Sequence, residues 1–352
     1  MSKCSYCQTD NTKLLNCAAC LQVSYCNKKC QKDHWKLHKP RCQPWKIVSV
    51  EGKGKGVIAT RKIKKGDVVM MEKPVLVLDK GGNNYNPEDL SFTEQFMKQP
   101  KKIREEILDL HHERPEESNF LLKLFDIFNC NNIGIDVGIG SSSGQAVYLN
   151  ISRLNHSCSP NVVWSYKRSN MIMKEVRALR DIDVGEELSA TYLGNNVFAT
   201  SSERRIQLQK SWKFECKCRL CNLPDDEQEE NDKKRMMMNK LHWRTPTLKM
   251  SGRFEEAFES EWTKLALMME MEEDLIMEIP NALIEVYELS ELGRRKGLAL
   301  RDYSHYAKEA KEMAEKFGDC FLEVVEEKID SARRGGRSFD MESLMEQFLN
   351  NF

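Results

Sequence analysis

The spacing of cysteine and histidine at the start of the chain constrains its fold more than any other feature. Eight residues that can bind a metal ion occur between positions 4 and 42: Cys4, Cys7, Cys17, Cys20, Cys26, Cys30, His38 and Cys42. Eight ligands suffice for two closed tetrahedral zinc sites, so we expect structural rather than catalytic zinc. A segment this short has almost no apolar core, and zinc therefore has to supply most of its folding free energy.

Cysteine usage also predicts a cellular compartment. The chain has 13 cysteines, which in a secreted protein would indicate disulfides. Its opening residues, Met1-Ser2-Lys3-Cys4, lead into polar sequence without the apolar segment of a signal peptide. No run approaches the eighteen apolar residues of a membrane span. We therefore expect zinc binding in a reducing compartment, the cytoplasm or the nucleus or both, and no membrane partner.

Charge is unevenly distributed along the chain, although the formal net charge is zero. Residues 1–48 contain nine basic and two acidic side chains, and residues 222–352 contain nineteen basic and thirty acidic ones. Two zinc ions bound by seven thiolates would subtract three charges from the first segment and leave about +4. That charge is too small to predict nucleic acid as a direct specific ligand.

The polar segment 155–161 (Asn-His-Ser-Cys-Ser-Pro-Asn) is the second informative feature. Its side chains offer many hydrogen-bond donors and acceptors, and Pro160 blocks a regular continuation. It follows an alternating apolar run at 148–154 and precedes the apolar residues 162–164. Alternation favours strands, so we expect one strand on each side. Taken alone, this segment could also be a polar turn with a hydrogen-bonded histidine.

Apolar periodicity predicts mixed secondary structure elsewhere. Strands are expected at 45–50, 57–59, 68–71 and 74–78, with a turn at 64–67 and a glycine-rich turn at 52–56. Residues 88–130 are expected to be helical, with a second helix that begins at Pro115. An acidic linker at 225–230 should then lead into four to six antiparallel helices. These elements predict an α+β protein.

Four blocks of this sequence occur in the order seen in SET-domain protein lysine methyltransferases. They are Lys53-Gly54-Lys55-Gly56-Val57, the segment 155–161, residues 185–192 (Gly-Glu-Glu-Leu-Ser-Ala-Thr-Tyr) and residues 214–221 (Phe-Glu-Cys-Lys-Cys-Arg-Leu-Cys). The first 42 residues have the metal-ligand pattern of a MYND zinc finger. The chain thus resembles the SET-and-MYND family of protein methyltransferases over roughly residues 4–221.

The resemblance implies a domain order. A MYND finger would occupy residues 4–42 and a SET domain residues 45–200, with a helical insert at about 88–135. A post-SET zinc segment would occupy residues 201–223, and a helical domain residues 224–352. The MYND finger would precede the glycine-rich strand pair, whereas in the familiar arrangement it interrupts the SET domain.

The resemblance also implies three zinc sites. In MYND fingers the sites interleave, which assigns Cys4, Cys7, Cys26 and Cys30 to one ion and Cys17, Cys20, His38 and Cys42 to the other. His34 lies four residues before His38 and is an alternative ligand. The third site would combine Cys158 with Cys216, Cys218 and Cys221. Cys130 and Cys320 would then be the two cysteines left over.

The resemblance implies a cofactor, S-adenosylmethionine (SAM). Lys53, Gly54 and Lys55 would lie against its methionine part, and Asn155 and His156 would hold its adenine. Asn131 would also contact it, with Asn129 as an alternative. The remaining SAM-binding candidates are Tyr192 and Phe214.

The catalytic candidates are three aromatic residues, Tyr192, Tyr148 and Trp212. Tyr192 matches the family's tyrosine, and Tyr148 matches another aromatic beside the lysine pocket. Trp212 stands where familiar active members have a second tyrosine. A tryptophan offers a cation–π face but no hydroxyl acceptor, which puts turnover and methylation multiplicity in question.

Two functions follow from these assignments. The first is SAM-dependent methylation of lysine in histone or non-histone proteins, by a monomer. The second is a catalytically weak scaffold or transcriptional co-regulator that acts through partner binding. In either case Gln31 and Trp35 match MYND positions that contact proline-containing peptides. Alternatively, Trp35 only covers the small zinc-bound core.

Overall fold

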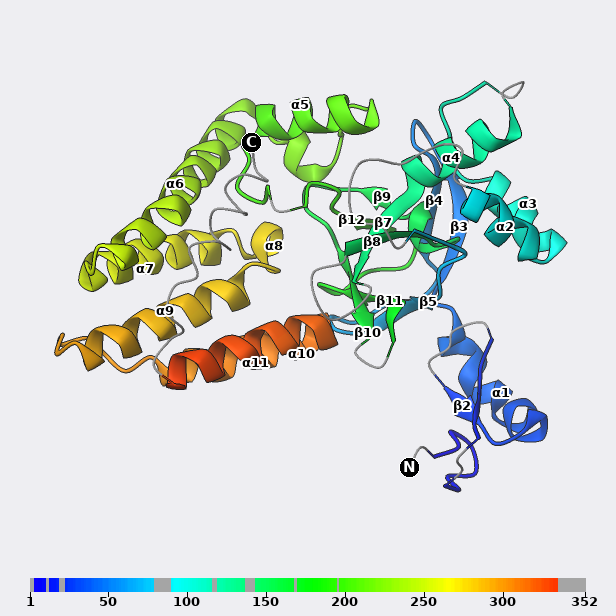
Figure 1. Cartoon of the computed structure of the whole chain (residues 1–352), viewed down its shortest axis with the longest axis horizontal. Helices are drawn as coiled ribbons and strands as arrows, with labels where there is room; N and C mark the ends of the chain where they lie inside the picture. The colour runs from blue at the N-terminus through cyan, green and yellow to red at the C-terminus, as the bar shows by residue number, and fades with distance from the viewer. Residues whose placement is uncertain are drawn as a thin grey trace. The chain divides into compact units, whose positions relative to one another are not determined.

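The computed structural model describes residues 3–10, 13–18, 23–78, 90–115, 119–136, 143–167, 170–194 and 196–334. The chain divides into two compact units, Met1–Thr191 and Tyr192–Phe352. Figure 1 draws the first unit from blue to green and the second from green to red. No helix among the described residues has both the length and the apolar character that a membrane span needs.

The N-terminal module is a short hairpin followed by one helix. Strands β1 (Leu15–Asn16) and β2 (Ser24–Tyr25) pair antiparallel, and α1 spans Lys28–Cys42. Asn27 caps α1, because its side chain accepts a hydrogen bond from the backbone N–H of Cys30 at 2.9 Å. Among the described residues, the buried core of this module is Cys4, Cys17, Tyr25 and Cys42. A core made mostly of cysteine agrees with the expectation that zinc supplies the folding free energy.

Three small sheets and a helical insert follow in the described part of the first unit. The first has the order β3-β4-β12-β9, in which only the β12–β9 pair is parallel. The second has the order β10-β11-β5 and the third the order β6-β8-β7, both antiparallel. The strands are β3 (Trp45–Val50), β4 (Gly54–Ala59), β5 (Val68–Glu72), β6 (Leu76–Leu78), β7 (Asn132–Asp136), β8 (Ser143–Val147), β9 (Asn155–His156), β10 (Val162–Lys167), β11 (Asn170–Ala178) and β12 (Glu187–Ala190).

The alternating run at 148–154 is not a strand, contrary to the sequence prediction. It forms a turn and the short 3₁₀ helix η1 (Ile151–Arg153). The carboxylate of Glu72 accepts hydrogen bonds from the backbone N–H groups of Asn150 and Ile151 at 3.0 Å each. These N–H groups therefore need no neighbouring strand. Burial raises the pKa of Glu72, although the same N–H groups act to lower it.

The helical insert contains α2 (Leu90–Lys98), α3 (Lys101–Leu108) and α4 (Phe120–Asn131). The helix expected to begin at Pro115 begins five residues later, because Asn119 caps it by accepting from the N–H of Leu121 at 2.8 Å. The helical insert ends at Asn131 rather than near residue 135, since β7 follows immediately. Its apolar core includes Phe96 and Ile107.

The second unit is helical. The expected acidic linker at 225–230 is instead the start of the 26-residue helix α6, with three acidic residues in its first turn. Carboxylates stabilise the positive end of a helix dipole, so acidic sequence there favours helix rather than linker. The described helices are α5 (Ser201–Trp212), η2 (Arg219–Asn222), α6 (Asp225–Met250), α7 (Phe254–Glu270), α8 (Glu272–Leu275), α9 (Ile279–Arg295), α10 (Ser304–Phe317) and α11 (Asp319–Arg334).

The apolar faces of α6, α7, α9, α10 and α11 meet in one core. Its described members include Met238, Leu265, Ile284 and Ala310. The six described helices from α6 to α11 agree with the expected four to six. Mixed sheet and helix, with a helical region after the sheets, confirms the predicted α+β class.

Candidate cofactor and metal sites

Four thiols of the N-terminal module meet at one point. The sulfur atoms of Cys4, Cys7, Cys26 and Cys30 all lie within 4.8 Å of one another. The Cys7–Cys26 and Cys26–Cys30 sulfur distances are 3.7 and 3.4 Å. Tetrahedral zinc with Zn–S bonds of about 2.3 Å requires sulfur atoms about 3.8 Å apart. This donor set therefore fits one zinc ion, with the four residues that the resemblance to MYND fingers assigns to it.

A second group brings together Cys17, His38 and Cys42, with their ligand atoms within 4.8 Å of one another. The sulfur atoms of Cys17 and Cys42 are 3.6 Å apart. Cys20, the predicted fourth ligand, lies outside the described residues. The alternative ligand His34 is not in this group: its Nδ1 lies 3.0 Å from the Tyr25 hydroxyl, and its ring stacks on that of His38.

Trp35 and Gln31 lie on α1 beside these ligands. The Trp35 side chain is 40% exposed, and its ring centroid is 5.8 Å from that of His38. Gln31 is half-buried. Trp35 is thus adjacent to a ligand histidine and still presents much of its indole surface to solvent.

Three more thiols group together in the second unit. The sulfur atoms of Cys216, Cys218 and Cys221 lie within 4.8 Å of one another, and Cys221 belongs to η2. Three thiolates are one ligand short of a closed zinc site. Cys158, the predicted fourth ligand, belongs to the first unit, where its sulfur is 3.2 Å from Nε2 of His156.

The glycine-rich segment forms the tight connection between β3 and β4, where Val50 pairs with Gly54. Gly52 and Gly54 have φ values of +70° and +74°, which favour glycine, and a Cβ on either would meet open space. Gly56 has a different role. A Cβ there would lie only 2.8 Å from Nδ2 of Asn155 and 2.9 Å from Oε1 of Glu187.

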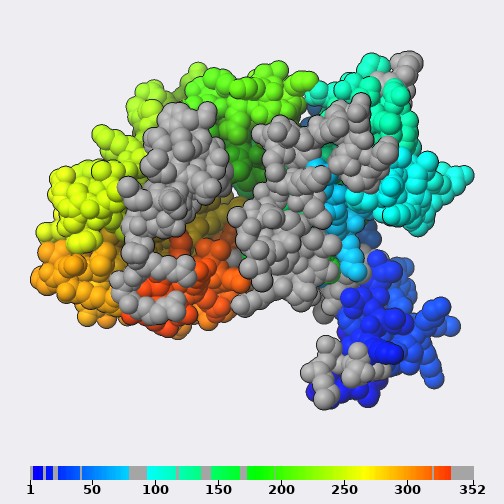
Figure 2. All heavy atoms as spheres, in the orientation of Figure 1, coloured from blue at the N-terminus to red at the C-terminus, as the bar shows by residue number. Residues whose placement is uncertain are grey.

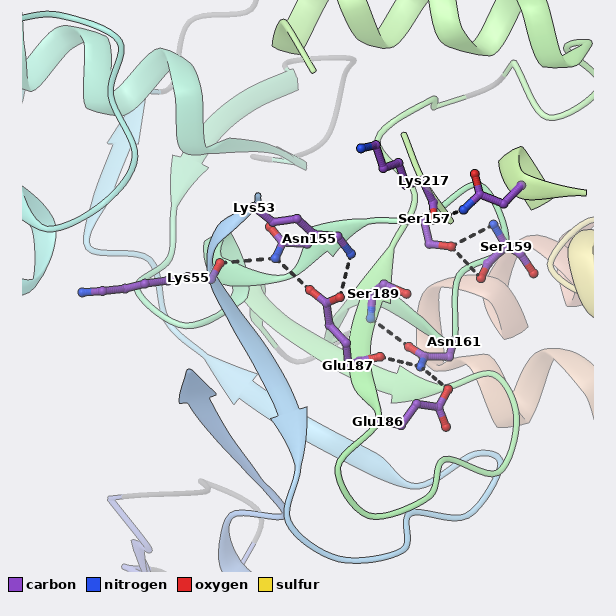
Figure 3. Close-up of polar contacts among 11 residues, drawn as sticks. Lys53, Lys55, Asn155, Ser157, Ser159, Asn161, Glu186, Glu187, Ser189 and Lys217 are labelled. Atoms are coloured by element: carbon purple, nitrogen blue, oxygen red, sulfur yellow. Dashed lines mark hydrogen bonds and ion pairs between the residues drawn. The ribbon is translucent and has the colours of Figure 1, made fainter. Parts of the chain in front are cut away.

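Asn155 ties this turn to β12. Its Nδ2 donates to the backbone carbonyl of Lys55 at 3.3 Å and to Oε1 of Glu187 at 2.8 Å (Figure 3). The other oxygen of Glu187 accepts from Nζ of Lys53 at 2.7 Å. Lys53, Lys55, Asn155 and Glu187 therefore form one network, which we call the turn network, and Gly56 leaves room for it.

Asn161 closes the polar segment against the same strand. Its Nδ2 donates to the backbone carbonyl of Glu187 at 2.8 Å and to Oε1 of Glu186 at 3.0 Å (Figure 3). Its Oδ1 accepts from the N–H of Ser189 at 2.8 Å. Burial acts to raise the pKa of Glu186, but Arg180 and Asn161 hold that pKa below its usual value.

Two polar residues near the turn have roles that their sequence context does not predict. Asp109, after α3, accepts from Lys55 and, at 2.8 Å, from the buried Arg153. Lys55, followed by Arg153, holds the pKa of Asp109 below its usual value. Neither Asp109 nor Glu187 was among the predicted site residues. Asp109 lies in no motif, but the position of Glu187 in block 185–192 was a usable signal.

The side chain of Asn131 is buried at the end of α4. Its Nδ2 donates to the backbone carbonyls of His111 and Ile127, each at 2.7 Å. The backbone carbonyl of Asn131 accepts a hydrogen bond from the Ser152 hydroxyl at 2.9 Å. Asn131 therefore fastens the insert to the segment before β9.

The predicted aromatic residues lie in different settings. Tyr148 is fully buried in the core of the sheets, and this burial raises the pKa of its hydroxyl. In the second unit the Tyr192 and Trp212 rings contact each other, with centroids 5.5 Å apart and planes inclined by 44°. Phe214, two residues beyond Trp212, is half-buried.

Comparison with known protein families adds an independent line of evidence. The SET domain family matches residues 54–193, which contain all of the turn network except Lys53, one residue before the match, and the MYND finger family matches residues 4–42. Over 252 residues the chain is 30% identical to N-lysine methyltransferase SMYD2 of Homo sapiens, which covers 68% of this chain and 53% of SMYD2. The human histone-lysine N-methyltransferase SMYD3 is 30% identical over 238 residues, which cover 63% of this chain and 52% of SMYD3.

This chain belongs to the SET- and MYND-domain family of lysine methyltransferases. It spans about half the length of the curated relatives that it matches. Among solved structures, the methyltransferase domain of human SETMAR aligns with a TM-score of 0.26 and 24% identity. That alignment covers 43% of this chain and 45% of the SETMAR domain. Within the family, the MYND finger accounts for the two N-terminal ligand groups and the SET domain for the turn network.

Proposed function

We propose that this protein transfers methyl groups from SAM to lysine side chains of protein substrates. The observation that carries the proposal is the turn network. Asn155 and Glu187, from β9 and β12, hold the glycine-rich turn in place through Lys55 and Lys53. These segments are the ones that SET-domain enzymes use for SAM, and they lie within or beside the SET match.

The residues of the turn suit a bound cofactor. Gly54 has open space beside its α-carbon, so a ligand can approach the backbone closely. The side chains of Asn155 and His156 already have partners inside the protein, Glu187 for the first and Cys158 for the second. We therefore assign adenine binding to the backbone of these two residues. Their side chains would act by keeping that backbone in position.

When bound, SAM supplies the methyl group as an electrophile on a sulfonium sulfur. The protein has to desolvate the lysine amine, favour its neutral form and orient it. Tyr192 and Trp212 are suited to this task, because two contacting rings exclude water and Tyr192 adds a hydroxyl. We assign the lysine-binding wall to these rings, with Tyr192 as the orienting group and Phe214 beside the cofactor.

The buried Tyr148 is the weakest of the catalytic candidates. Its ring lies in the core of the sheets, and contact with a substrate lysine would require that core to open. We propose instead that Tyr148 supports the segment leading to β9.

The MYND finger would dock proline-containing proteins through Gln31 and Trp35. The half-exposed indole of Trp35 is held by a metal-bound helix and offers a flat apolar surface for a polyproline-like ligand. Changing both residues to alanine should weaken binding of a proline-rich peptide and leave SAM affinity unchanged. Equal loss of both activities in protein that keeps its zinc would contradict independent docking.

The third zinc site remains a proposal based on Cys158 together with Cys216, Cys218 and Cys221. The three thiols of the second unit need one more ligand, and the chain has few unassigned cysteines. Elemental analysis should give about three zinc ions per chain. Two zinc ions and a reactive thiol at Cys158 would contradict the third site.

The enzymatic proposal is tested by SAM binding and methyl transfer together. Isothermal titration should detect SAM binding to the purified protein, and labelled SAM should transfer its methyl group to lysine on a protein array. SAM binding without any transfer would favour the scaffold function. The scaffold alternative is based on Trp212. This residue lacks the hydroxyl of the tyrosine found in familiar active members. Under the scaffold alternative, Trp212→Tyr should increase transfer or change the number of methyl groups added.

A further inference from the structure

A groove on the helical insert has no role in the proposed methyl transfer. Its volume is about 370 Å³, and α2, α3 and the start of α4 line it. Phe96 and Phe120 form one wall, with their rings edge to face and centroids 5.3 Å apart. Leu108 and Met97 complete its apolar lining. Figure 2 shows part of the insert, in cyan, at the molecular surface.

The apolar lining is unusually open to water. Met97 is 58% exposed and Phe120 is 39% exposed, although Phe96 beneath them belongs to the core of the insert. Binding becomes more favourable when a ligand displaces water from apolar surface in a concave site. The groove is therefore suited to apolar side chains, and its floor is anchored by the core of the insert.

The edge of this groove is positively charged. Residues 98–104 contain four basic side chains, although Lys98 and Lys102 each have an exposed glutamate partner on the same helix. Two of them, Lys101 and Arg104, line the groove, and Nη1 of Arg104 lies 3.6 Å from the sulfur of Met97. Glu105 also lines it, but its contact with Lys101 is a long, exposed one of 3.9 Å. Such pairs contribute little, so a further carboxylate can still be attracted.

The start of α3 adds to the same charge. The residue before it, Pro100, makes no side-chain cap, and no acidic residue occurs in the first turn. Lys101 and Lys102 stand instead at the helix end where the dipole favours negative charge. A carboxylate from a binding partner would compensate the positive charge at this helix end. An apolar side chain next to that carboxylate would occupy the groove.

We propose that this groove docks an acidic amphipathic segment of a partner protein. Apolar side chains of that segment enter between Phe96, Met97 and Phe120, and its carboxylates meet Lys101 and Arg104. Charge complementarity selects this occupant over a basic one. The proposal does not depend on methyl transfer, because none of these residues belongs to the turn network or to a metal group.

The test uses two designed fluorescent peptides with the same apolar residues at helical spacing. One carries glutamate and the other lysine at every polar position. Fluorescence anisotropy on the full chain should show the glutamate peptide binding at least about tenfold more tightly, with an affinity that falls as salt rises. Phe120→Ser and the double change Lys101→Glu with Arg104→Glu should each weaken that binding at least about tenfold.

Matched controls are Met236→Ser on α6 and Lys308→Glu on α10, two exposed positions in the second unit. They should leave peptide binding unchanged, and every variant should keep its helical signal and SAM affinity. Equal binding of both peptides, no binding of either, or binding that survives both groove variants would overturn the proposal. So would a dimer in sedimentation that Phe120→Ser dissolves, because a second copy would then occupy the groove.

Discussion

Two polar networks in this molecule differ in their exposure: one faces solvent and the other is buried. The turn network joins the segment around Lys53 to β9 and β12, and its lysines are exposed to solvent. The second network, which we call the lobe cluster, consists of Lys249, Glu261, Lys264, Glu285 and Glu288 within the helical unit. There the Glu261 and Lys264 side chains are only 1% and 8% exposed, with an ion-pair distance of 2.6 Å.

The contrast indicates a different role for each network. A polar group that faces solvent can exchange water for a ligand at little cost, whereas a buried charge has to keep its internal partner. The turn network should therefore control cofactor binding with a small effect on folding. The lobe cluster should control folding of the helical unit with no effect on cofactor binding.

The largest expected effect is on folding and comes from Glu261→Ala. This change leaves the ammonium group of Lys264 buried without its nearest partner, so the free energy of unfolding should fall by about 3 kcal/mol. Urea unfolding measures it, with the exposed pair of Lys308 and Glu312 on α10 as the control. Glu312→Ala should cost at most about 0.5 kcal/mol. If Glu261→Ala lowered SAM affinity without lowering stability, the separation of roles would be wrong.

The next effect is a change in stability with pH, caused by the carboxyl group of Glu288. Burial and the neighbouring Glu285 raise its pKa to about 7, from about 4.3 in the unfolded chain. Between these values the folded state binds more protons, so this group's contribution to stability falls as pH rises. Relative to wild type, Glu288→Gln should become more stable across this range, by on the order of 2–3 kcal/mol.

Urea unfolding of both proteins at pH 4.5, 6 and 8 measures the difference. His242, whose burial lowers its pKa to about 4, contributes with the opposite sign between about pH 4 and 6.5. It is present in both proteins and cancels in the comparison. A difference between the two proteins that does not change with pH would show that folding does not raise the pKa of Glu288.

A smaller effect, on cofactor affinity, should come from Asn155→Ala. The change removes the hydrogen bonds from Nδ2 to Lys55 and Glu187 that hold the glycine-rich turn. SAM affinity should fall about tenfold to a hundredfold, equivalent to roughly 1–3 kcal/mol. The control is Asn239→Ala, whose side chain accepts from the Trp243 indole on an exposed face of α6. SAM titration that finds both variants equal to wild type would remove the turn network from the cofactor site.

The smallest effect should come from Glu187→Gln. Glutamine keeps an oxygen acceptor for Asn155 and loses only the charge that attracts Lys53, in a pair that is partly exposed. SAM binding should weaken by less than about 1 kcal/mol, and Glu187→Ala should weaken it more. A loss with Glu187→Gln as large as with Glu187→Ala would mean that charge, rather than geometry, positions the turn.

The sequence predicted those parts of the molecule in which local spacing determines geometry. Zinc fixes the distances between its ligands, so the spacing predicted two zinc sites, and the resemblance to MYND fingers assigned Cys4, Cys7, Cys26 and Cys30 to one group, which the fold brings together. His38 and Cys42, one helical turn apart on α1, are a similar case. Strands β3, β5 and β6 were also predictable, because their apolar residues occur in short runs bounded by turns.

Contacts between distant residues were not predictable from one sequence. Glu72 holds the backbone at Asn150 and Ile151, 78 or more positions away, and this contact turns an apparent strand into a turn. Asp109 reaches Lys55 and Arg153 in the same way. The acidic start of α6 was misread because acidic composition describes a linker and a favourable helix start equally well.

The central claim, that this chain methylates lysine with SAM, is tested most directly by comparing wild type with Tyr192→Phe in one labelled transfer assay. The variant keeps the aromatic ring that contacts Trp212 and loses only the hydroxyl. We predict that wild type places labelled methyl groups on lysine of substrate proteins. Tyr192→Phe should bind SAM within about twofold of wild type yet transfer at least about tenfold more slowly, because the hydroxyl acts in the transition state. Tight SAM binding by both proteins, with no methylated lysine from either, would contradict the claim.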